Sequence, residues 1–190
     1  MMHGDFYADL YRYVDDRSTL GKKAIRVLVR NYGAQASAVF RFGKYLQRAN
    51  RRWWFTPLVW VGWLFYLPLR VYVRHGLGIR LDLSADVGPG LYIGHFGNIH
   101  LSSCKLGAHC AIGQSTHILP NRDGDGPTIG DRVWIGAHAQ VLGSVSVGSG
   151  STISAASVVR RNVPENALCL GNPARIIVRP YDNRKLLHLD

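Results

Sequence analysis

The stretch GLYIGHFGNIHL, residues 90–101, contains a histidine whose presence the neighbouring residues do not explain. Ile93 and Ile99 lie six positions apart on either side of His95, a spacing that fits neither a helix nor a simple strand. An imidazole with a pKa of about 6.5 can accept a proton from a hydroxyl group at neutral pH, and so can act as a general base. His95 is therefore our first candidate for a catalytic residue.

Aliphatic residues recur every six positions from residue 81 to residue 159, with one spacing of seven and one of eleven. This period excludes a helix, and the alternation and tight-turn dipeptides of an antiparallel sandwich are missing. The pattern resembles the hexapeptide repeat of the left-handed parallel β-helix, a solenoid with a narrow apolar core, and would make about four coils. The repeats begin at Leu81, Val87, Ile93, Ile99, Leu106, Ile112, Ile118, Ile129, Ile135, Val141, Val147, Ile153 and Val159.

Three hexads form one triangular coil in such a fold, so hexads that lie three apart should stack on one another. The hexads beginning at 93, 112, 135 and 153 then form one column, whose third residues are His95, Gln114, Ala137 and Ala155. Two small residues in line with a histidine predict a shallow groove that leads to its ring. The spacing of eleven falls on the polar stretch LPNRDGDGPT, residues 119–128, which we expect to leave the solenoid as a loop.

From about residue 80 to 178 the chain resembles the serine O-acetyltransferase branch of the hexapeptide acyltransferases. The resemblance rests on the stretches VGPGLYIGH (87–95), IGDRVWIGAHAQVLGSVSVGSGSTISAASVV (129–159) and GNPARII (171–177). It implies acetyl-CoA as donor, a hydroxyl as acceptor, His95 as general base, no metal, and a homotrimer in which a neighbouring protomer closes the site. Pairing of trimers through the helical region is left open.

The resemblance also assigns residues to the two substrates. Gly136, Ala137 and Ala155 would line the track of CoA, with Asn172 and Arg175 near its nucleotide end. Asp82 is the nearest upstream carboxylate that could orient His95, although its spacing from His95 differs from that of the family's Asp–His pair; otherwise Asp82 is a solvent-facing corner residue. Around the acceptor we expect four polar residues, Gln114, His117, Asn121 and Asp125. We expect His100, His109 and His138 to be surface residues without a catalytic role.

Two departures from the family pattern concern the acceptor. Serine acetyltransferases carry a second histidine beside an arginine at the end of the loop, where this chain has Asp125 and Gly126. Its N-terminal helical region is also shorter. Both weaken serine as acceptor, and the likeness is closer to the enzymes of exopolysaccharide and capsule assembly that O-acetylate sugars. We therefore expect a sugar or lipid-linked saccharide as acceptor, with two alternatives: serine O-acetylation in cysteine synthesis, and a non-catalytic membrane-associated scaffold.

The positive charge of the chain lies almost entirely in its first part. Residues 1–80 contain 14 Lys and Arg against 4 Asp and Glu, whereas residues 81–190 contain 9 against 8. Such a surplus favours an anionic partner. Residues 5–52 have helical patterns, and the last of these mixes Phe40, Phe42, Tyr45 and Leu46 with basic residues. A Lys/Arg-rich amphipathic helix is typical of an anionic membrane surface.

The segment WWFTPLVWVGWLFYLPL, residues 53–69, is uncharged and contains four tryptophans. Three interpretations stay open: a monotopic segment in the bilayer interface, a buried helical hairpin at an oligomer contact, and a transmembrane helix. The third is disfavoured because Pro57 and Pro68 limit the uninterrupted part to ten residues, where a span needs about 20. Nucleic acid is a poor partner, because the tryptophans adjoin aliphatic residues and are not spaced among basic ones.

These patterns predict the organisation of the chain. We expect a basic helical region at 1–78, the β-helix at 79–178 and a tail at 179–190. Three scattered cysteines suggest neither a disulfide framework nor a metal site, and the N-terminus does not have the pattern of a secretory signal. We therefore expect a cytoplasmic enzyme, peripheral on the inner-membrane face.

Overall fold

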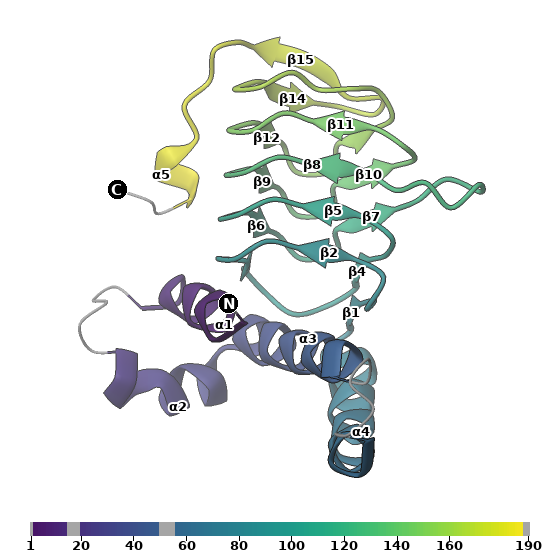
Figure 1. The fold of residues 1–190 in the computed structure, drawn as a ribbon. Helices are drawn as coiled ribbons and strands as arrows, with labels where there is room; N and C mark the ends of the chain where they lie inside the picture. The colour runs from purple at the N-terminus through teal and green to yellow at the C-terminus, as the bar shows by residue number, and fades with distance from the viewer. Residues whose placement is uncertain (1, 15–19, 50–55, 188–190) are drawn as a thin grey trace.

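The structure, a computed structural model, describes residues 2–14, 20–49 and 56–187 of the chain. A group of helices lies at one end of a solenoid of stacked short strands (Figure 1). This confirms the predicted fold class, a mainly β, left-handed parallel β-helix preceded by an N-terminal helical region. Trp53 and Trp54, two of the tryptophans of the apolar segment, lie outside the described residues.

The helices occupy the N-terminal part and one short stretch near the C-terminus. They are α1 (Met2–Tyr11), α2 (Leu20–Arg30), α3 (Tyr32–Ala49), α4 (Thr56–Val71), the π-helical turn η3 (Tyr72–Gly76) and α5 (Arg184–Leu187). The expectation that Pro57 and Pro68 limit the apolar helix to the ten residues between them is wrong, because α4 is 16 residues long and includes both prolines. Proline removes one backbone donor, and the wider η3 turn follows directly. Within the described ranges, no helix has the length and apolar character that crossing a bilayer requires.

The strands of the solenoid form three parallel sheets, which are the three sides of its triangular cross-section. Sheet A contains β1 (Ile79–Leu81), β4 (Ile99–Leu101), β7 (His117–Leu119), β10 (Gln140–Leu142) and β13 (Val158–Val159). Sheet B contains β2 (Asp86–Val87), β5 (Lys105–Leu106), β8 (Thr128–Ile129) and β11 (Ser146–Val147). Sheet C contains β3 (Tyr92–Ile93), β6 (Ala111–Ile112), β9 (Trp134–Ile135), β12 (Thr152–Ile153), β14 (Leu168–Leu170) and the antiparallel β15 (Arg175–Val178).

The predicted stacking of the repeats is confirmed on sheet C, where Ile93, Ile112, Ile135 and Ile153 are successive cross-strand partners. It is wrong by two residues on sheet A. Leu101, and not Ile99, pairs with Ile118, so Leu101 begins that repeat. The strands make four full coils and part of a fifth, to which β13 and β14 belong. Burial of one aliphatic per repeat makes a continuous apolar core along the axis.

Four side chains of the N-terminal helical region satisfy backbone groups at the open edge of the first coil. Arg41 donates to the carbonyl oxygens of Val87 (2.7 Å) and Gly88 (2.6 Å), and Lys44 donates to those of Leu83 and Ala85. The Asp9 carboxylate accepts from the Leu91 N–H (2.8 Å), and the Tyr13 hydroxyl from that of Ile93 (2.9 Å). Unpaired buried backbone groups are costly, so these contacts make the helices a polar cap for the solenoid.

A buried ion pair holds this cap together. Asp9 and Arg41 are 1% and 9% exposed, and the Arg41 Nε lies 2.9 Å from the Asp9 Oδ2, which also accepts a hydrogen bond from Ser37. The apolar surroundings of the Tyr13 hydroxyl raise its pKa well above 10, so it remains a neutral donor. The helical region is therefore attached to the solenoid through fully paired polar groups.

Candidate active site

His95 lies at the corner of the triangle where the chain passes from sheet C to sheet A. We call this corner the histidine corner; it comprises residues 94–98, 113–116, 136–139 and 154–157 of the successive coils. The His95 side chain is exposed, while its neighbour Phe96 packs against Tyr32 of α3 with ring centroids 5.1 Å apart. The Gly97 N–H donates to the carbonyl oxygen of Leu77 at 2.9 Å, so the segment between η3 and β1 holds this corner in place. The arrangement presents an imidazole to solvent on an anchored turn.

The first coil has two more residues at this corner than the coils above it. Six residues separate Ile93 from His100, whereas four separate Ile112 from His117, its partner in the next coil. The carbonyl of Gly97 accepts from Ser115 in the same way that the carbonyl of Gln114 accepts from His138. Gly97 therefore stacks under Gln114, and His95 lies two residues before the predicted column. The column prediction needs this correction, although His95 stays at the same corner.

The upper part of the column consists of small side chains that are partly exposed to solvent. Ala137 is half-buried and Ala155 is exposed, and both follow tightly packed backbone. A Cβ on the buried Gly136 would meet the backbone nitrogen of Ala155, which explains the glycine before Ala137. The side chains at positions 137 and 155 of this corner are small, and the track of CoA along them stays a prediction. The Gln114 side chain is exposed one coil below.

Asp82 does not face His95 as its hydrogen-bond partner. Its Oδ2 lies 3.2 Å from the Nε2 of His100, and both side chains are about one quarter exposed. This corrects two expectations: Asp82 pairs with another histidine, and His100 is a half-buried member of a carboxylate–imidazole pair. His100 also stands beside His117 on sheet A, where the two are cross-strand neighbours. Their proximity follows from the register and not from the sequence spacing.

The loop between β7 and β8 projects from a different corner of the triangle, where the chain passes from sheet A to sheet B (Figure 1). Asn121 shapes it, because its Oδ1 accepts from the N–H groups of Asp123 (3.1 Å) and Asp125 (3.0 Å). Asp125 is exposed at the rim of a groove between the loop and the neighbouring coils. A Cβ on Gly126 would collide with the Ser103 carbonyl, so the packing of the loop admits only glycine there.

The predicted site residues are thus divided between two corners of one chain. His95, Gln114, Ala137 and Ala155 share the histidine corner, whereas Asn121 and Asp125 lie at the loop corner, across sheet A. His117 is on sheet A itself, half-buried and next to His100. Within one chain, the loop residues Asn121 and Asp125 therefore do not lie beside His95.

Asn172 and Arg175 lie beyond both groups, at the far end of the solenoid from the helices. Both are exposed in or beside the antiparallel pair β14–β15, which covers the last coil (Figure 1). Along the axis they lie beyond Ala137 and Ala155, on the side away from His95, and their contact with CoA stays a prediction. In the described part of the chain, no group of three or more His, Cys, Asp or Glu is arranged to hold a metal ion.

A second group of polar side chains, which the sequence patterns did not single out, lies beside the first strand of the solenoid. Tyr66, Arg70 and Arg74 recur every four residues on the helix that ends at η3, and they line a cleft together with Arg80 and Asp82. The four-residue spacing was available as a signal, since such residues share one helix face. This polar spacing is difficult to recognise in the sequence because the surrounding segment consists mostly of aliphatic and aromatic residues.

Comparison with known proteins supports this assignment of fold and repeats. The family described as "Bacterial transferase hexapeptide (six repeats)" matches residues 126–161. The chain is 35% identical over 108 residues to a serine acetyltransferase of Mycobacterium tuberculosis, covering 57% of this chain and 40% of the relative. It is 33% identical over 123 residues to that of Bacillus pumilus, covering 62% of this chain and 57% of the relative.

A solved structure extends the similarity to the helical region. The serine acetyltransferase of Neisseria gonorrhoeae, in complex with serine, superimposes with a TM-score of 0.72 at 26% identity, covering 92% of this chain and 68% of that chain. The curated relatives named above are only about half spanned by this chain. The exopolysaccharide branch finds no support in these comparisons. The chain carries hexapeptide repeats of the bacterial transferase type on a scaffold similar to that of serine acetyltransferases.

Proposed function

We propose that this protein is an acetyl-CoA-dependent O-acetyltransferase in which His95 is the general base. The observation that carries the proposal is an exposed histidine on an anchored turn, at the same corner of a hexapeptide β-helix as the small residues Ala137 and Ala155. The similarity to serine acetyltransferases supports the same chemistry.

The proposed step is a direct transfer. His95 accepts the proton of the acceptor hydroxyl as its oxygen attacks the thioester carbon, and a C–O bond forms. The tetrahedral oxyanion is stabilised by backbone N–H groups of the corner, and its collapse breaks the C–S bond. The proton on His95 then passes to the CoA thiolate, so the base is regenerated without an acyl-enzyme. Ala137 and Ala155 leave space for the pantetheine arm, and the Arg175 guanidinium offers a positive charge to the nucleotide phosphates.

We further propose a homotrimer as the active form. The loop residues Asn121 and Asp125 lie at another corner than His95, so a second protomer is needed to bring such a loop beside the histidine corner. Closed cyclic symmetry provides this contact three times with one kind of interface.

For the acceptor, serine is the first candidate, because the relatives named above are serine acetyltransferases. A sugar or lipid-linked saccharide is the second. The specific observation in its favour is the loop, where the exposed Asp125 and the packing-restricted Gly126 stand at the positions that the resemblance assigns to an arginine and a histidine. Neither residue offers, at its position, the cationic side chain that would hold a free amino-acid carboxylate.

A single assay separates the candidates. Release of CoA thiol from acetyl-CoA is measured with serine, with free sugars and with lipid-linked saccharides, for the wild type and for His95→Ala. Serine-dependent release that His95→Ala abolishes supports the first candidate, and release only with a saccharide supports the second. No acceptor-dependent release with any of them favours the non-catalytic scaffold and contradicts the proposal.

We also propose that the protein rests on an anionic membrane surface through α4. Trp60, Leu64 and Phe65 are 71%, 68% and 65% exposed on this helix, and the region that contains it has a surplus of Lys and Arg. Apolar side chains beside cationic ones suit the bilayer interface. Co-sedimentation with phosphatidylglycerol vesicles at low salt tests this. A protein that remains in the supernatant, and whose α4 face is covered in a trimer, would contradict it.

A further inference from the structure

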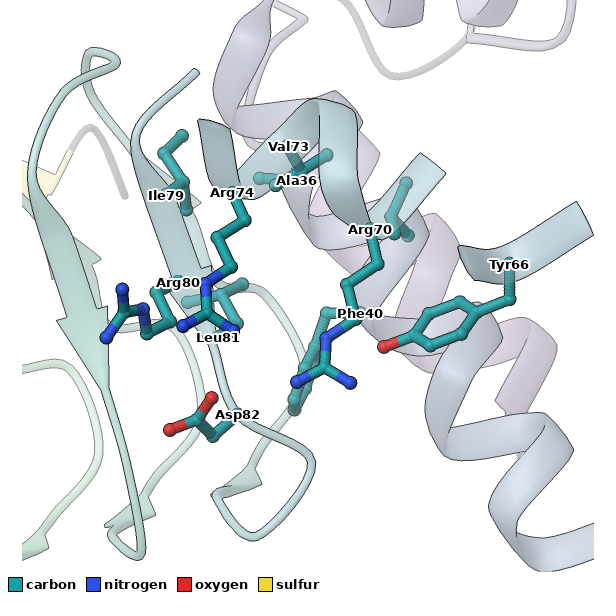
Figure 2. A pocket seen from close by; sticks show the side chains of 11 residues that line it. Ala36, Phe40, Tyr66, Arg70, Val73, Arg74, Ile79, Arg80, Leu81 and Asp82 are labelled. Carbon is teal, nitrogen blue, oxygen red and sulfur yellow. The ribbon is translucent and has the colours of Figure 1, made fainter. Parts of the chain in front are cut away.

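A cleft between the helices and the first strand of the solenoid carries an unusual density of positive charge. It is bounded by α3, by the end of α4 with η3, and by β1 with the residues that follow it. Arg70 and Arg74 extend from the helix toward the strand that carries Arg80, and the Asp82 carboxylate lies on the same side (Figure 2). Apolar residues, among them Phe40 and Ile79, form its inner wall.

The three arginines are not neutralised within the described part of the protein. None of them has an Asp or Glu oxygen within 4 Å there, whereas Arg41 and Arg184 both do. The one carboxylate of the cleft, Asp82, is engaged by the Nε2 of His100. Three like charges around one cleft repel one another, and a bound anion would remove this repulsion.

The helix side of the cleft has one further polar group, the hydroxyl of Tyr66. The Tyr66 side chain is 1% exposed, and no other described residue accepts or donates a hydrogen bond to its hydroxyl. Figure 2 shows this oxygen turned toward the side of the cleft where Arg70 lies. Burial raises the pKa of Tyr66, so the hydroxyl stays protonated at neutral pH and can donate.

We propose that this cleft is a binding site for a phosphate group, held by Arg70, Arg74 and Arg80 with the Tyr66 hydroxyl as an additional donor. Guanidinium groups match the tetrahedral oxyanion of a phosphate ester because each offers parallel N–H donors in a rigid fork. The site is distinct from the CoA track proposed above. It lies beside the first coil, while Asn172 and Arg175 lie at the opposite end of the solenoid.

The phosphate can come from two sources. The cleft lies at the end of α4, whose outer face exposes apolar side chains, so the headgroup of an anionic lipid can reach the arginines while its chains contact α4. Alternatively, a soluble phosphorylated compound fills the same cleft. Both sources present the same oxyanion chemistry, and experiment distinguishes them.

The test compares two variants with equal loss of charge. The cleft variant is Arg70→Gln, Arg74→Gln and Arg80→Gln; the control is Arg26→Gln, Arg30→Gln and Arg48→Gln, three exposed arginines of α2 and α3 outside the cleft. Binding of inorganic pyrophosphate is measured by calorimetry, and binding to phosphatidic acid vesicles in phosphatidylcholine by flotation. Circular dichroism confirms that both variants are folded.

We expect saturable binding of at least one probe by the wild type and the control, and at least a tenfold loss of affinity in the cleft variant, on the order of 1.4 kcal/mol. Binding of pyrophosphate in solution assigns a soluble source, and binding of vesicles alone assigns a lipid headgroup. Equal weakening of both variants would reduce the effect to net charge and overturn the proposal. So would the absence of binding to either probe, or a loss of CoA affinity in the cleft variant, which would assign the arginines to CoA.

Discussion

Two histidines that are five residues apart in the sequence differ in environment. His95 is exposed at the histidine corner, while His100 is half-buried on sheet A and paired with Asp82. A base that must reach an acceptor needs an open approach, which His95 has. A general base is also oriented by a carboxylate hydrogen-bonded to its imidazole, and of these two histidines His100 is the one with such a partner, Asp82.

The first prediction separates these two candidates. His95→Ala should lower the turnover of acetyl transfer by about 10²- to 10⁴-fold, as expected for the loss of a general base. His100→Ala should lower it much less, because His100 lies on sheet A, beyond the histidine corner. Steady-state release of CoA thiol measures both. The reverse order of effects would assign the base to His100.

The cysteines allow a prediction about pH. Burial raises the pKa of both Cys104 and Cys110 to about 12, and it also raises the pKa of Cys169. Thiolates are the reactive form, so a native protein at pH 8 should react with Ellman's reagent at far fewer than its 3 thiols, and a denatured one at all of them. Rapid stoichiometric labelling of the native protein would contradict the burial of these side chains.

The same shifts determine the direction of a stability change. Unfolded thiols ionise near pH 8.5, whereas Cys104 and Cys110 in the folded protein do so near 12. The folded state therefore holds these protons more tightly. The stabilisation that this gives is complete below about pH 8.5 and is lost as the pH rises toward 12, which denaturation at a series of alkaline pH values will show.

At the scale of elements, the polar cap is the contact on which the arrangement of helices and solenoid depends. Asp9, on α1, joins Arg41 of α3 to the N–H of Leu91 in the first coil, so one carboxylate links three segments. A buried pair of this kind contributes little when complete but is expensive to break, because the remaining charge stays buried without a partner.

Asp9→Asn should therefore lower the free energy of unfolding by about 3–5 kcal/mol. The matched control is Asp182→Asn, which removes the partner of Arg184 in an exposed pair and should leave the unfolding midpoint unchanged. Denaturation by urea, followed by circular dichroism, gives both values. Equal effects of the two substitutions would show that the cap does not depend on Asp9.

Most of the solenoid could be predicted from the sequence, because its period places one aliphatic in the core of every hexad. The register on sheet A could not. Ile99 and Leu101 are both buried, at 1% and 0% exposure, since residues two apart in a strand face the same way, and either could begin the repeat. The interval from Ile93 to Leu101 is eight residues and that from Leu101 to Leu106 is five. The apparent spacing of seven from Ile99 therefore combines the longer corner that contains His95 with a shorter connection after β4.

The long-range polar contacts were beyond prediction for a different reason. Tyr13 and Ile93 are 80 positions apart, and no period relates the helices to the first coil. The pairing of Asp82 with His100 likewise depends on which strands lie side by side. The residue types predict which side chains can act as acids, bases or hydrogen-bond partners, but only the register of the strands determines which of them form pairs.

For the whole molecule, the separation of the histidine corner from the loop has a consequence for assembly. If the active unit is a trimer whose sites combine the corner of one protomer with the loop of the next, two defective chains can complement each other. Co-expression of His95→Ala with Asn121→Ala, which breaks the turn that holds the loop, should restore part of the activity that each lacks alone.

The measurement is CoA release by the mixed oligomer after purification through a tag on each chain. Light scattering should give three times the protomer mass of 21.1 kDa. Activity of the mixture no greater than the sum of the two separate variants would place the loop and the histidine in independent roles. A monomeric protein with full activity would contradict the trimer.

The polar cap also prevents the first coil from pairing with strands of another molecule. A parallel coil whose backbone groups are unpaired is a template for further strands, and the first coil would be one if Asp9, Tyr13, Arg41 and Lys44 were removed with the helices. A chain reduced to the β-helix would then expose the unpaired backbone groups of its first coil, and strands of other molecules could pair with them and form fibres. The helices thus prevent further strands from pairing with the first coil, so that the solenoid does not extend from one molecule into the next.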